Sequence, residues 1–297
     1  MRSEIQRKQV RVNGITLSVL TAGPETGPLL IFLHGFPEQA WTWKPYLEHF
    51  ASAGYRVLAP DQRGYNLSDK PRSIGDYALS ELAQDVVGLI HWAGQAQADI
   101  VGHDWGGVVA WTLCHKHAEW IRRAVIINMA HPAVFRAHQF GSFKQFKKSL
   151  YTLFFQLPWL PERRLSQDGF ARLTNTLVRS SRPGTFDPEI LACYRAAWRQ
   201  RGALTGMINW YRAVFRVGRA PRGSDQPRPR LIQVPLLMIW GARDRFLGRE
   251  MVEPSLERCA EGHVEWIEEG THWVHHEFPA QVTGFIREWL GKLGLDG

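Results

Sequence analysis

Short apolar runs alternate with segments of helical periodicity along the first third of the chain. Four runs have the length of buried strands: Leu29–Leu33, Tyr55–Ala59, Ala98–Val101 and Ala124–Asn128. Three segments between them predict helices: Trp43–Ala53, Ser80–Ala93 and Trp105–His117. Ahead of these elements, Lys8–Val12 and Thr16–Thr21 predict a hairpin that turns at Asn13-Gly14. Regular alternation of strand and helix predicts an α/β fold with a mostly parallel sheet and helices on both faces.

The alternation stops near His131. From there to Arg230 the apolar positions are helical and rich in aromatic residues, without a convincing buried strand. Alternation then resumes in four elements: strand Pro235–Trp240, helix Gly248–Arg258, strand His263–Ile267 and helix Ala280–Leu293. We therefore predict a core domain formed by residues 1–130 and 231–297, with residues 131–230 inserted as a helical cap. A ligand should bind at the carboxyl ends of the strands, under the cap.

Composition indicates a globular protein with a full core. Of the 297 residues, 44% are hydrophobic, yet no run approaches the ~18 apolar residues of a membrane span. The first ten residues lack the apolar stretch of a secretory signal. Cys114, Cys193 and Cys259 are widely spaced and match neither a metal site nor a disulfide framework. These features predict a cytoplasmic protein that does not bind membranes.

The net charge of +8 raises the question of a nucleic-acid partner. No nucleic-acid-binding motif accompanies the basic residues. They are scattered, apart from a local group: Arg219, Arg222, Arg228 and Arg230. We therefore interpret the excess charge as solvated surface and expect no nucleic-acid partner.

The segment Gly102–Gly106 follows a predicted strand and opens a predicted helix. Strand, glycine-flanked turn and helix form the context of a nucleophile elbow, whose central residue is usually Ser. Here the central residue is Asp104, which excludes a serine-type esterase. A carboxylate is already an anion and needs no base before it attacks. It suits displacement at a saturated carbon, such as that of an epoxide or a carbon–halogen bond.

Two further residues follow strands in the order expected for a catalytic triad. Asp244 follows Pro235–Trp240, and His272 follows His263–Ile267. Because the carboxyl ends of parallel strands meet at one edge of a sheet, we expect both side chains to converge on Asp104. Taken singly, Asp244 could also be a turn or cap residue, and His272 an ordinary loop histidine.

The segment His34–Pro37 follows the strand Leu29–Leu33. A loop in this position normally supplies one backbone N–H of an oxyanion hole, and the residue after the nucleophile supplies the other. We assign these two donors to Phe36 and Trp105. Pro37 is a candidate for a cis peptide bond, and an ordinary turn is the alternative interpretation of the segment.

Motifs along nearly the whole chain resemble those of the soluble epoxide hydrolases of the α/β-hydrolase fold. Six segments carry the resemblance: His34-Gly35-Phe36-Pro37-Glu38, Pro60-Asp61-Gln62-Arg63-Gly64-Tyr65, Ser68-Asp69-Lys70-Pro71, Gly102-His103-Asp104-Trp105-Gly106-Gly107, Asn209-Trp210-Tyr211-Arg212 and Gly270-Thr271-His272-Trp273. The resemblance implies hydrolysis of epoxides to vicinal diols. It implies an ester intermediate on Asp104, which water cleaves with the help of His272 and Asp244.

The resemblance also implies two cap tyrosines that bind and protonate the oxirane oxygen. A Tyr-x-x-x-Phe-Gln stretch points to Tyr151, and the Asn-Trp-Tyr-Arg stretch points to Tyr211. The alternative is that both are packing residues with a polar tip, which is common for tyrosine. Tyr194 matches no such motif and is interpreted as a packing residue.

Dehalogenases are the alternative function, because haloalkane and fluoroacetate dehalogenases share the elbow with Asp. Haloalkane dehalogenases hold the halide with the indole N–H after the nucleophile and a second side-chain donor where this chain has Phe36. Trp105 fits the first requirement, whereas Phe36 has no side-chain donor. Fluoroacetate dehalogenases carry Arg at the position of Trp105.

Two interpretations of Glu38 stay open: it orders water in the active site, or it is a carboxylate at a helix N-terminus. His275 is a second candidate for the catalytic histidine, but the Gly-x-His-Trp match favours His272. The run His275-His276-Glu277 contains metal-ligand types. Adjacent residues at a helix start are not expected to face one point, so we predict no metal and no cofactor.

The expected substrate is a small apolar epoxide, with water as the second reactant. Its contacts are expected to include Phe36, Trp105 and Trp210, because these aromatic residues lie in the motifs around the predicted site. The protein is expected to be a monomer or a homodimer.

Overall fold

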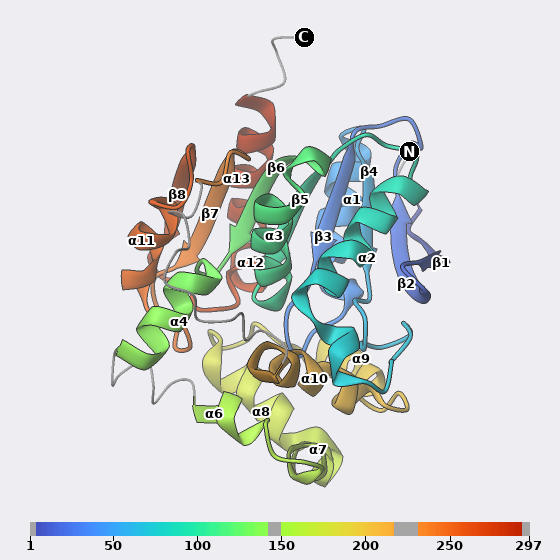
Figure 1. Cartoon of the computed structure of the whole chain (residues 1–297), viewed down its shortest axis with the longest axis vertical. Coiled ribbons are helices and arrows are strands. Elements are labelled where there is room, and N and C mark those ends of the chain that lie inside the picture. The colour runs from blue at the N-terminus through green and yellow to red at the C-terminus, as the bar shows by residue number, and fades with distance from the viewer. Residues whose placement is uncertain (1–3, 142–149, 217–230, 293–297) are drawn as a thin grey trace.

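A central sheet organises the molecule. The computed structural model describes residues 4–141, 150–216 and 231–292. Its 8-stranded sheet has the order β1-β2-β4-β3-β5-β6-β7-β8 (Figure 1). The strands are β1 (Gln6–Val12), β2 (Ile15–Ala22), β3 (Leu29–Leu33), β4 (Arg56–Pro60), β5 (Ala98–His103), β6 (Ile121–Ile127), β7 (Leu236–Gly241) and β8 (Gly262–Ile267). Strand β2 is antiparallel to β1 and β4, and the other neighbouring pairs are parallel.

The parallel strands are apolar because helices cover both of their faces. Every residue of β3, β4 and β5 is buried, which explains why these strands appear in the sequence as unbroken hydrophobic runs.

The antiparallel hairpin of β1 and β2 is formed around a tight turn. Asn13 and Gly14 have φ values of 45° and 75°, the backbone that a two-residue turn of matching twist requires.

Each face of the sheet has its own hydrophobic core. Helices α1 (Lys44–Ser52) and α13 (Pro279–Lys292) pack on one face. Helices α2 (Leu79–Trp92) and α3 (Trp105–Lys116) pack on the other. The short helices α11 (Val252–Leu256) and α12 (Val274–Glu277) flank β8 in the chain.

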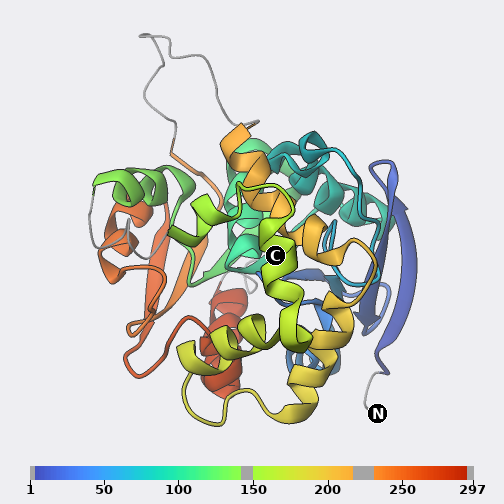
Figure 2. The same ribbon diagram turned by 90° about the horizontal axis from the view of Figure 1, so that it is seen from below.

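Between β6 and β7 the chain leaves the sheet and forms a series of helices, here called the inserted segment. These are α4 (Pro132–Gly141), α6 (Leu150–Phe154), α7 (Leu160–Ser166), α8 (Ala171–Ser180), α9 (Pro188–Trp198) and α10 (Ala203–Arg216). Helices α6 to α10 lie together below the sheet in Figure 1, and Figure 2 shows them from that side. They cover the end of the sheet at which the parallel strands finish.

The predicted α/β fold, with a mostly parallel sheet and helices on both faces, is confirmed. The predicted helix Gly248–Arg258 is shorter in the structure, where a 3-10 turn (Arg249–Met251) precedes α11. The domain limits at residues 130 and 231 remain a prediction, and the arginine group after residue 218 lies outside the described residues. None of the helices in the described part of the chain is long and apolar enough to cross a membrane.

Candidate active site

Asp104 occupies a sharp turn between β5 and α3. Its φ of 49° and ψ of −118° are rare for a residue with a side chain, and such a turn raises the carboxylate above the sheet. The two positions that flank the elbow, Gly102 and Gly106, have no room for a side chain. A Cβ on Gly106 would lie 2.1 Å from the carbonyl oxygen of Leu33, and a Cβ on Gly102 would lie 2.4 Å from that of Gly106. The Gly-x-Asp-x-Gly pattern therefore encodes this backbone.

The structure brings Asp104, His272 and Asp244 together. Nδ1 of His272 lies 2.7 Å from Oδ2 of Asp244, and Nε2 of His272 lies 3.5 Å from Oδ2 of Asp104. His272 and Asp244 are buried, whereas 13% of the Asp104 side chain stays accessible. His275 does not take the place of His272, because its Nε2 lies 3.2 Å from Oε1 of Glu38 instead.

The two carboxylates hold His272 in its charged form. Burial alone would lower the pKa of His272, but the charge of Asp244 and the interactions with Asp104 raise it to about 10. Burial alone would raise the pKa of Asp244, but the charge and hydrogen bond of His272 lower it. In this state His272 cannot act as a base, so general-base chemistry requires that one carboxylate first loses its charge.

Asn128, directly after β6, fixes Asp244 and is a residue that the sequence motifs do not single out. Its Nδ2 donates to Oδ2 of Asp244 at 2.8 Å, and its Oδ1 accepts the backbone N–H of Gly241 at 3.0 Å. The backbone N–H groups of Phe246 and Leu247 donate to the other carboxylate oxygen. A polar residue at the end of an apolar parallel strand is the signal that could have identified Asn128.

The loop after β3 directs a backbone donor at Asp104. The N–H of Phe36 donates to Oδ1 of Asp104 at 2.9 Å. The peptide bond between Phe36 and Pro37 is cis, as predicted. Trp105 is the first residue of α3, so its N–H has no partner within the helix and is placed to be a second donor.

A cavity of about 1680 Å³ opens over Asp104, between the core and the inserted segment. Its wall includes Asp104 and His272 from strand ends, and Tyr151 and Tyr211 from helices α6 and α10. The two tyrosine rings lie 5.9 Å apart at an angle of 77°. Tyr211 also packs edge-on against Phe36, with ring centres 5.4 Å apart. Both tyrosines predicted from the resemblance therefore face the same cavity as Asp104.

Both tyrosines favour the protonated form. Burial raises the pKa of Tyr151, and the charge of Asp104 adds to this. Burial also raises the pKa of Tyr211 well above its ordinary value, although an interaction with the Trp105 side chain acts in the opposite direction. Because a neutral phenol donates a hydrogen bond, the pair can donate to an oxygen atom held above Asp104.

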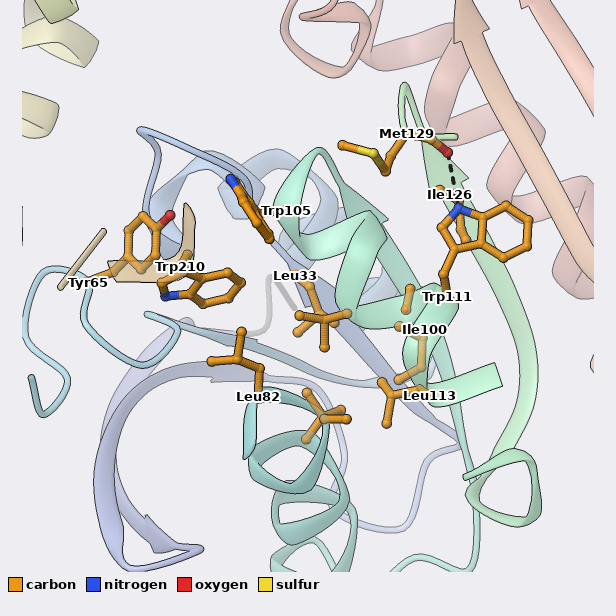
Figure 3. Packing of buried hydrophobic residues seen from close by; sticks show 14 of the residues in the cluster. Leu33, Tyr65, Leu82, Ile100, Trp105, Trp111, Leu113, Ile126, Met129 and Trp210 are labelled. Atoms are coloured by element: carbon orange, nitrogen blue, oxygen red, sulfur yellow. Dashed lines mark hydrogen bonds between the residues drawn. The ribbon is translucent and has the colours of Figure 1, made fainter. Parts of the chain in front are cut away.

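The predicted substrate contacts divide into two groups. Phe36 and Trp105 line the cavity, but Trp210 is absent from the described residues of its wall. Trp210 is fully buried between Tyr65 and Trp105, with ring centres 5.5 and 5.6 Å away (Figure 3). Its indole N–H donates to the carbonyl oxygen of Arg63 at 2.9 Å. Trp210 therefore supports Trp105 from behind.

Glu38, next to the Phe36 loop, is a buried carboxylate surrounded by imidazoles. Nδ1 of His103 lies 3.0 Å from its Oε2, and Nε2 of His275 and of His276 lie 3.2 and 2.7 Å from its Oε1. Burial alone would raise the pKa of Glu38, but these imidazoles hold it well below its ordinary value. The Nε2 atom of His103 lies 2.9 Å from the carbonyl oxygen of His272. Glu38 thus links the elbow to the loop that carries His272.

Tyr194, interpreted from the sequence as a packing residue, also joins this group. Its hydroxyl lies 3.0 Å from Oε1 of Glu38 and 3.2 Å from Nε2 of His276, and it hydrogen-bonds with Thr42. Its ring also stacks on Trp198, with centres 6.0 Å apart. The packing interpretation is incomplete, because the Tyr194 hydroxyl connects α9 of the inserted segment to a core carboxylate.

The same geometry corrects two statements made from the sequence. One donor atom each of Glu38, His275 and His276 lie within 4.8 Å of one another, so the expectation that the two histidines do not face one point is wrong. The 3-10 turn after Glu38 is capped by the side chain of Gln39, so Glu38 is not its capping carboxylate. That no metal binds here remains a prediction.

The sequence is similar to known proteins over almost its full length. A family model described as alpha/beta hydrolase fold matches residues 28–279. AB hydrolase superfamily protein YfhM of Bacillus subtilis (strain 168) is 43% identical over 281 residues, which cover 95% of this chain and 96% of that protein. Epoxide hydrolase 1 of Caenorhabditis elegans is 32% identical over 291 residues, which cover 96% of this chain and 70% of that protein.

The fold is similar to solved structures as well. A crystal structure of Bacillus megaterium epoxide hydrolase in complex with an inhibitor superposes with a TM-score of 0.85 at 26% identity. The superposition covers 95% of this chain and 99% of that chain. The similarity therefore includes the inserted segment as well as the sheet.

Proposed function

Because the chain belongs to the epoxide hydrolases of the α/β-hydrolase fold, we propose that it hydrolyses epoxides to vicinal diols. Epoxides are cyclic ethers, so enzymes of this family are hydrolases acting on ether bonds. The observation that supports the proposal most is that Asp104, His272, Tyr151 and Tyr211 line one cavity. In this proposal the inserted segment is a cap over the substrate.

In the first step, Asp104 attacks an oxirane carbon from the side opposite to the breaking C–O bond. The carboxylate borders the cavity and stays partly accessible, so it can reach a bound substrate. Tyr151 and Tyr211 donate to the ring oxygen, and one of them gives it a proton, so that an alcohol forms in place of an alkoxide. The product is an ester between Asp104 and the glycol.

In the second step, water cleaves this ester. Ester formation removes the charge of Asp104 and with it one cause of the raised pKa of His272. The imidazolium then passes its proton to the tyrosine that has lost one, and neutral His272 can accept a proton from water. Asp244, held by Asn128, keeps the ring in position through Nδ1.

The attacking water adds to the carboxyl carbon of Asp104. The backbone N–H of Phe36, 2.9 Å from Oδ1 of Asp104, and the N–H of Trp105 are the donors for the resulting oxyanion. A donor of this kind is worth ~3 kcal/mol of transition-state stabilisation. Collapse of the tetrahedral intermediate breaks the ester C–O bond, and the departing glycol oxygen takes the proton of the Asp104 carboxylic acid that forms. The diol leaves, Asp104 is again a carboxylate and His272 stays protonated, so the starting state is restored.

A single turnover in heavy-oxygen water tests the ester mechanism. With enzyme in excess over styrene oxide, the label should appear in the Asp104 carboxylate and the diol should stay unlabelled, because the diol oxygen comes from Asp104. Mass spectrometry of the peptide that contains Asp104 measures this, and the Asp104→Ala variant is the control. Label that appears in the diol during the first turnover would rule out the ester.

A dehalogenase activity receives less support from the same residues. Phe36 offers no side-chain donor to a halide, and the Trp105 side chain interacts with Tyr211. A halide leaves without a proton, so two neutral tyrosines favour an epoxide over a haloalkane. An assay with styrene oxide and a short haloalkane side by side should give diol without halide, and halide release at a similar rate would favour the alternative.

We also propose a cytoplasmic location. Cys114, Cys193 and Cys259 are all free thiols, a pattern typical of reducing compartments. Fractionation of cells that produce the untagged chain should recover it with the cytoplasmic proteins, and recovery in a secreted fraction would contradict this.

A further inference from the structure

Tyr151 lies on a helix that is too short to be stable alone. Helix α6 has five residues, whereas an isolated helix needs about 12–15 before it is even marginally stable in water. The backbone carbonyls at the end of a helix also have no partner within it. The position of the Tyr151 phenol therefore depends on the groups that hold the end of α6.

Two arginines of α10 hold this end. Arg212 donates from Nε to the carbonyl oxygen of Phe155 at 3.0 Å and from Nη2 to that of Leu157 at 2.7 Å. Arg216, one turn further along α10, donates to the carbonyl oxygen of Gln156 at 2.8 Å. Three consecutive carbonyls that follow α6 are thus bound by α10. The two helices cannot slide or turn past each other without breaking these bonds.

Every N–H group of the Arg212 guanidinium has a partner, since an arginine side chain has five such donors. Two of them bind the carbonyls of Phe155 and Leu157. Two others bind the carboxylate of Glu162 on α7, at 2.7 and 3.1 Å, and the fifth donates to Oδ1 of Asn209 at 3.3 Å. The Arg212 side chain is only 7% exposed and that of Glu162 18%, so loss of either partner would leave a shielded charge without its counterion. Lysine, with three donors on one nitrogen atom, cannot make this set of contacts.

The contact between the helices is reciprocal and lies beside both tyrosines. The side-chain amide of Gln156 donates from Nε2 to the backbone carbonyl of Tyr211 at 3.2 Å. The ring of Phe155 packs on both tyrosine rings, with its centre 5.7 Å from that of Tyr151 and 4.9 Å from that of Tyr211. Arg212 directly follows Tyr211, and the first carbonyl that it binds is four residues after Tyr151. These bonds therefore fix the backbone at both tyrosines at once.

We propose that Arg212 is a positioning residue that holds the phenols of Tyr151 and Tyr211 so that both can donate to one oxygen atom above Asp104. Arg212 is not among the described residues of the cavity wall, so its effect on a ligand passes through the tyrosines. That the oxygen belongs to an epoxide rests on the proposed function. Loss of Arg212 should therefore weaken donation to that oxygen and leave the nucleophile in place.

A double-mutant cycle tests whether Arg212 acts through the phenols. Arg212→Gln should lower kcat/KM for styrene oxide at least about tenfold, a part of the usual contribution of a general acid. In the Tyr151→Phe/Tyr211→Phe background, Arg212→Gln should cause no further loss, because the groups that it positions are already gone. Val282→Ala, in the core on the other face of the sheet, is the control for lost stability and should have the same effect in both backgrounds. An equal loss for Arg212→Gln in both backgrounds would show a merely structural role and overturn the proposal.

Conservative and exchanged charges show which contact of Arg212 matters. Arg212→Lys keeps the charge without the fork of donors, so its activity should stay close to that of Arg212→Gln. Glu162→Gln still accepts a hydrogen bond and should lose less. In the exchange Arg212→Glu/Glu162→Arg the ion pair can form, but a carboxylate at position 212 cannot donate to the carbonyls after α6. Full recovery in the exchange would show that the ion pair alone is needed and would overturn the proposal.

Binding of phenylacetamide, which cannot react, separates the positioning of the phenols from catalysis. Its carbonyl oxygen can accept from both phenols, whereas ethylbenzene has no acceptor. In titration calorimetry, Arg212→Gln and Tyr151→Phe/Tyr211→Phe should each bind phenylacetamide about tenfold more weakly than the wild type and bind ethylbenzene unchanged. A loss in the tyrosine variant without one in Arg212→Gln would overturn the role of Arg212 and leave the proposed function intact. The expected losses in a protein that turns over no epoxide would overturn the proposed function and leave this role intact.

Discussion

The Nε2 atom of His272 faces Oδ2 of Asp104 at 3.5 Å, at the outer limit of a hydrogen bond but well within reach of its charge. The opposite nitrogen of the same ring is fixed at 2.7 Å by Asp244. Two carboxylates thus act on one imidazole, and only that of Asp104 is consumed when an ester forms. Asp104 is therefore placed to control when His272 becomes a base.

We expect the Asp104→Asn variant to lower the pKa of His272 from about 10, because the amide has no charge while Asp244 keeps its own. An NMR titration of the His272 ring measures the shift. Asp168→Asn removes the same charge at an exposed position away from the cavity wall and should leave the pKa of His272 unchanged. An equal pKa in the wild type and in Asp104→Asn would show that Asp104 does not control the histidine.

The same interaction predicts how stability depends on pH. Because the pKa of His272 in the folded protein is raised above 6.5, its stabilisation is complete below pH 6.5 and is lost as the pH rises through about 10. Over this interval, the wild type should lose more free energy of unfolding than Asp104→Asn does. Urea denaturation at a series of pH values measures both curves, and parallel curves would contradict the expectation.

Replacement of His272 by Gln should stop the second step and spare the first, because the carboxylate attacks without a base. Incubation of His272→Gln with styrene oxide should increase the protein mass by one substrate molecule, as measured by intact-protein mass spectrometry. The Asp104→Ala/His272→Gln double variant should gain no mass. His263→Gln, at a histidine whose side chain is 59% exposed, should turn over normally. An unmodified His272→Gln protein would argue against the ester.

Tyr151 and Tyr211 should be needed for epoxide opening. We expect the Tyr151→Phe/Tyr211→Phe variant to lose about 10²- to 10⁴-fold in kcat/KM, the usual contribution of a general acid. Each single variant should lose less, because the other phenol still donates. Tyr55→Phe, outside the cavity wall, is the matched control. Undiminished activity of the double variant would remove both tyrosines from the acid role.

The sequence predicts best what is encoded locally. Asp104, Asp244 and His272 each follow an apolar strand, and flanking glycines mark the elbow, so their positions at one sheet edge follow from strand order alone. Tyr151 and Tyr211 have no such local signal. Helical periodicity does not say which face of the inserted segment meets the core, so only the resemblance to a family pointed to them.

The remaining residues depend on partners far along the chain. The sequence predicts Trp210 as a substrate contact, whereas in the structure its indole N–H donates to the carbonyl oxygen of Arg63. Tyr194 is interpreted from the sequence as a packing residue, because the carboxylate that its hydroxyl contacts, Glu38, lies 156 residues away along the chain. Asn128 supports Asp244 across 116 residues. Such pairings arise from the order of the strands and the docking of the inserted segment, which no local pattern contains.

Glu38 should make the protein sensitive to acid. Its pKa in the folded protein is held below 4.5, so its stabilisation is present above pH 4.5 and is lost as the pH falls through and below that value. The wild type should therefore exceed Glu38→Gln in free energy of unfolding at neutral pH, and the difference should shrink on acidification. Glu257→Gln, at an exposed position, is the control and should change the free energy of unfolding much less. A gap between wild type and Glu38→Gln that does not change with pH would contradict the expectation.

The inserted segment meets the core backbone to backbone at Gly206 of α10. A Cβ at Gly206 would lie 2.5 Å from the carbonyl oxygen of Gly64 and 2.7 Å from its Cα. Gly64 has a φ of 89°, a conformation that favours glycine, so this side of the contact is also constrained. We expect Gly206→Ala to destabilise the protein by about 1–3 kcal/mol and to reduce activity, because α10 also carries Tyr211.

Gly284 provides the matched control, since it also lies within a helix but has no heavy atom within 4 Å of an added Cβ. Gly284→Ala should stabilise the protein by about 0.5–1 kcal/mol, because Ala favours a helix and restricts the unfolded chain. Urea unfolding of the two variants under one set of conditions should therefore give changes of opposite sign. If Gly206→Ala were as stable and as active as the wild type, α10 could move away from Gly64 at no cost. This contact would then not be what holds Tyr211 over Asp104.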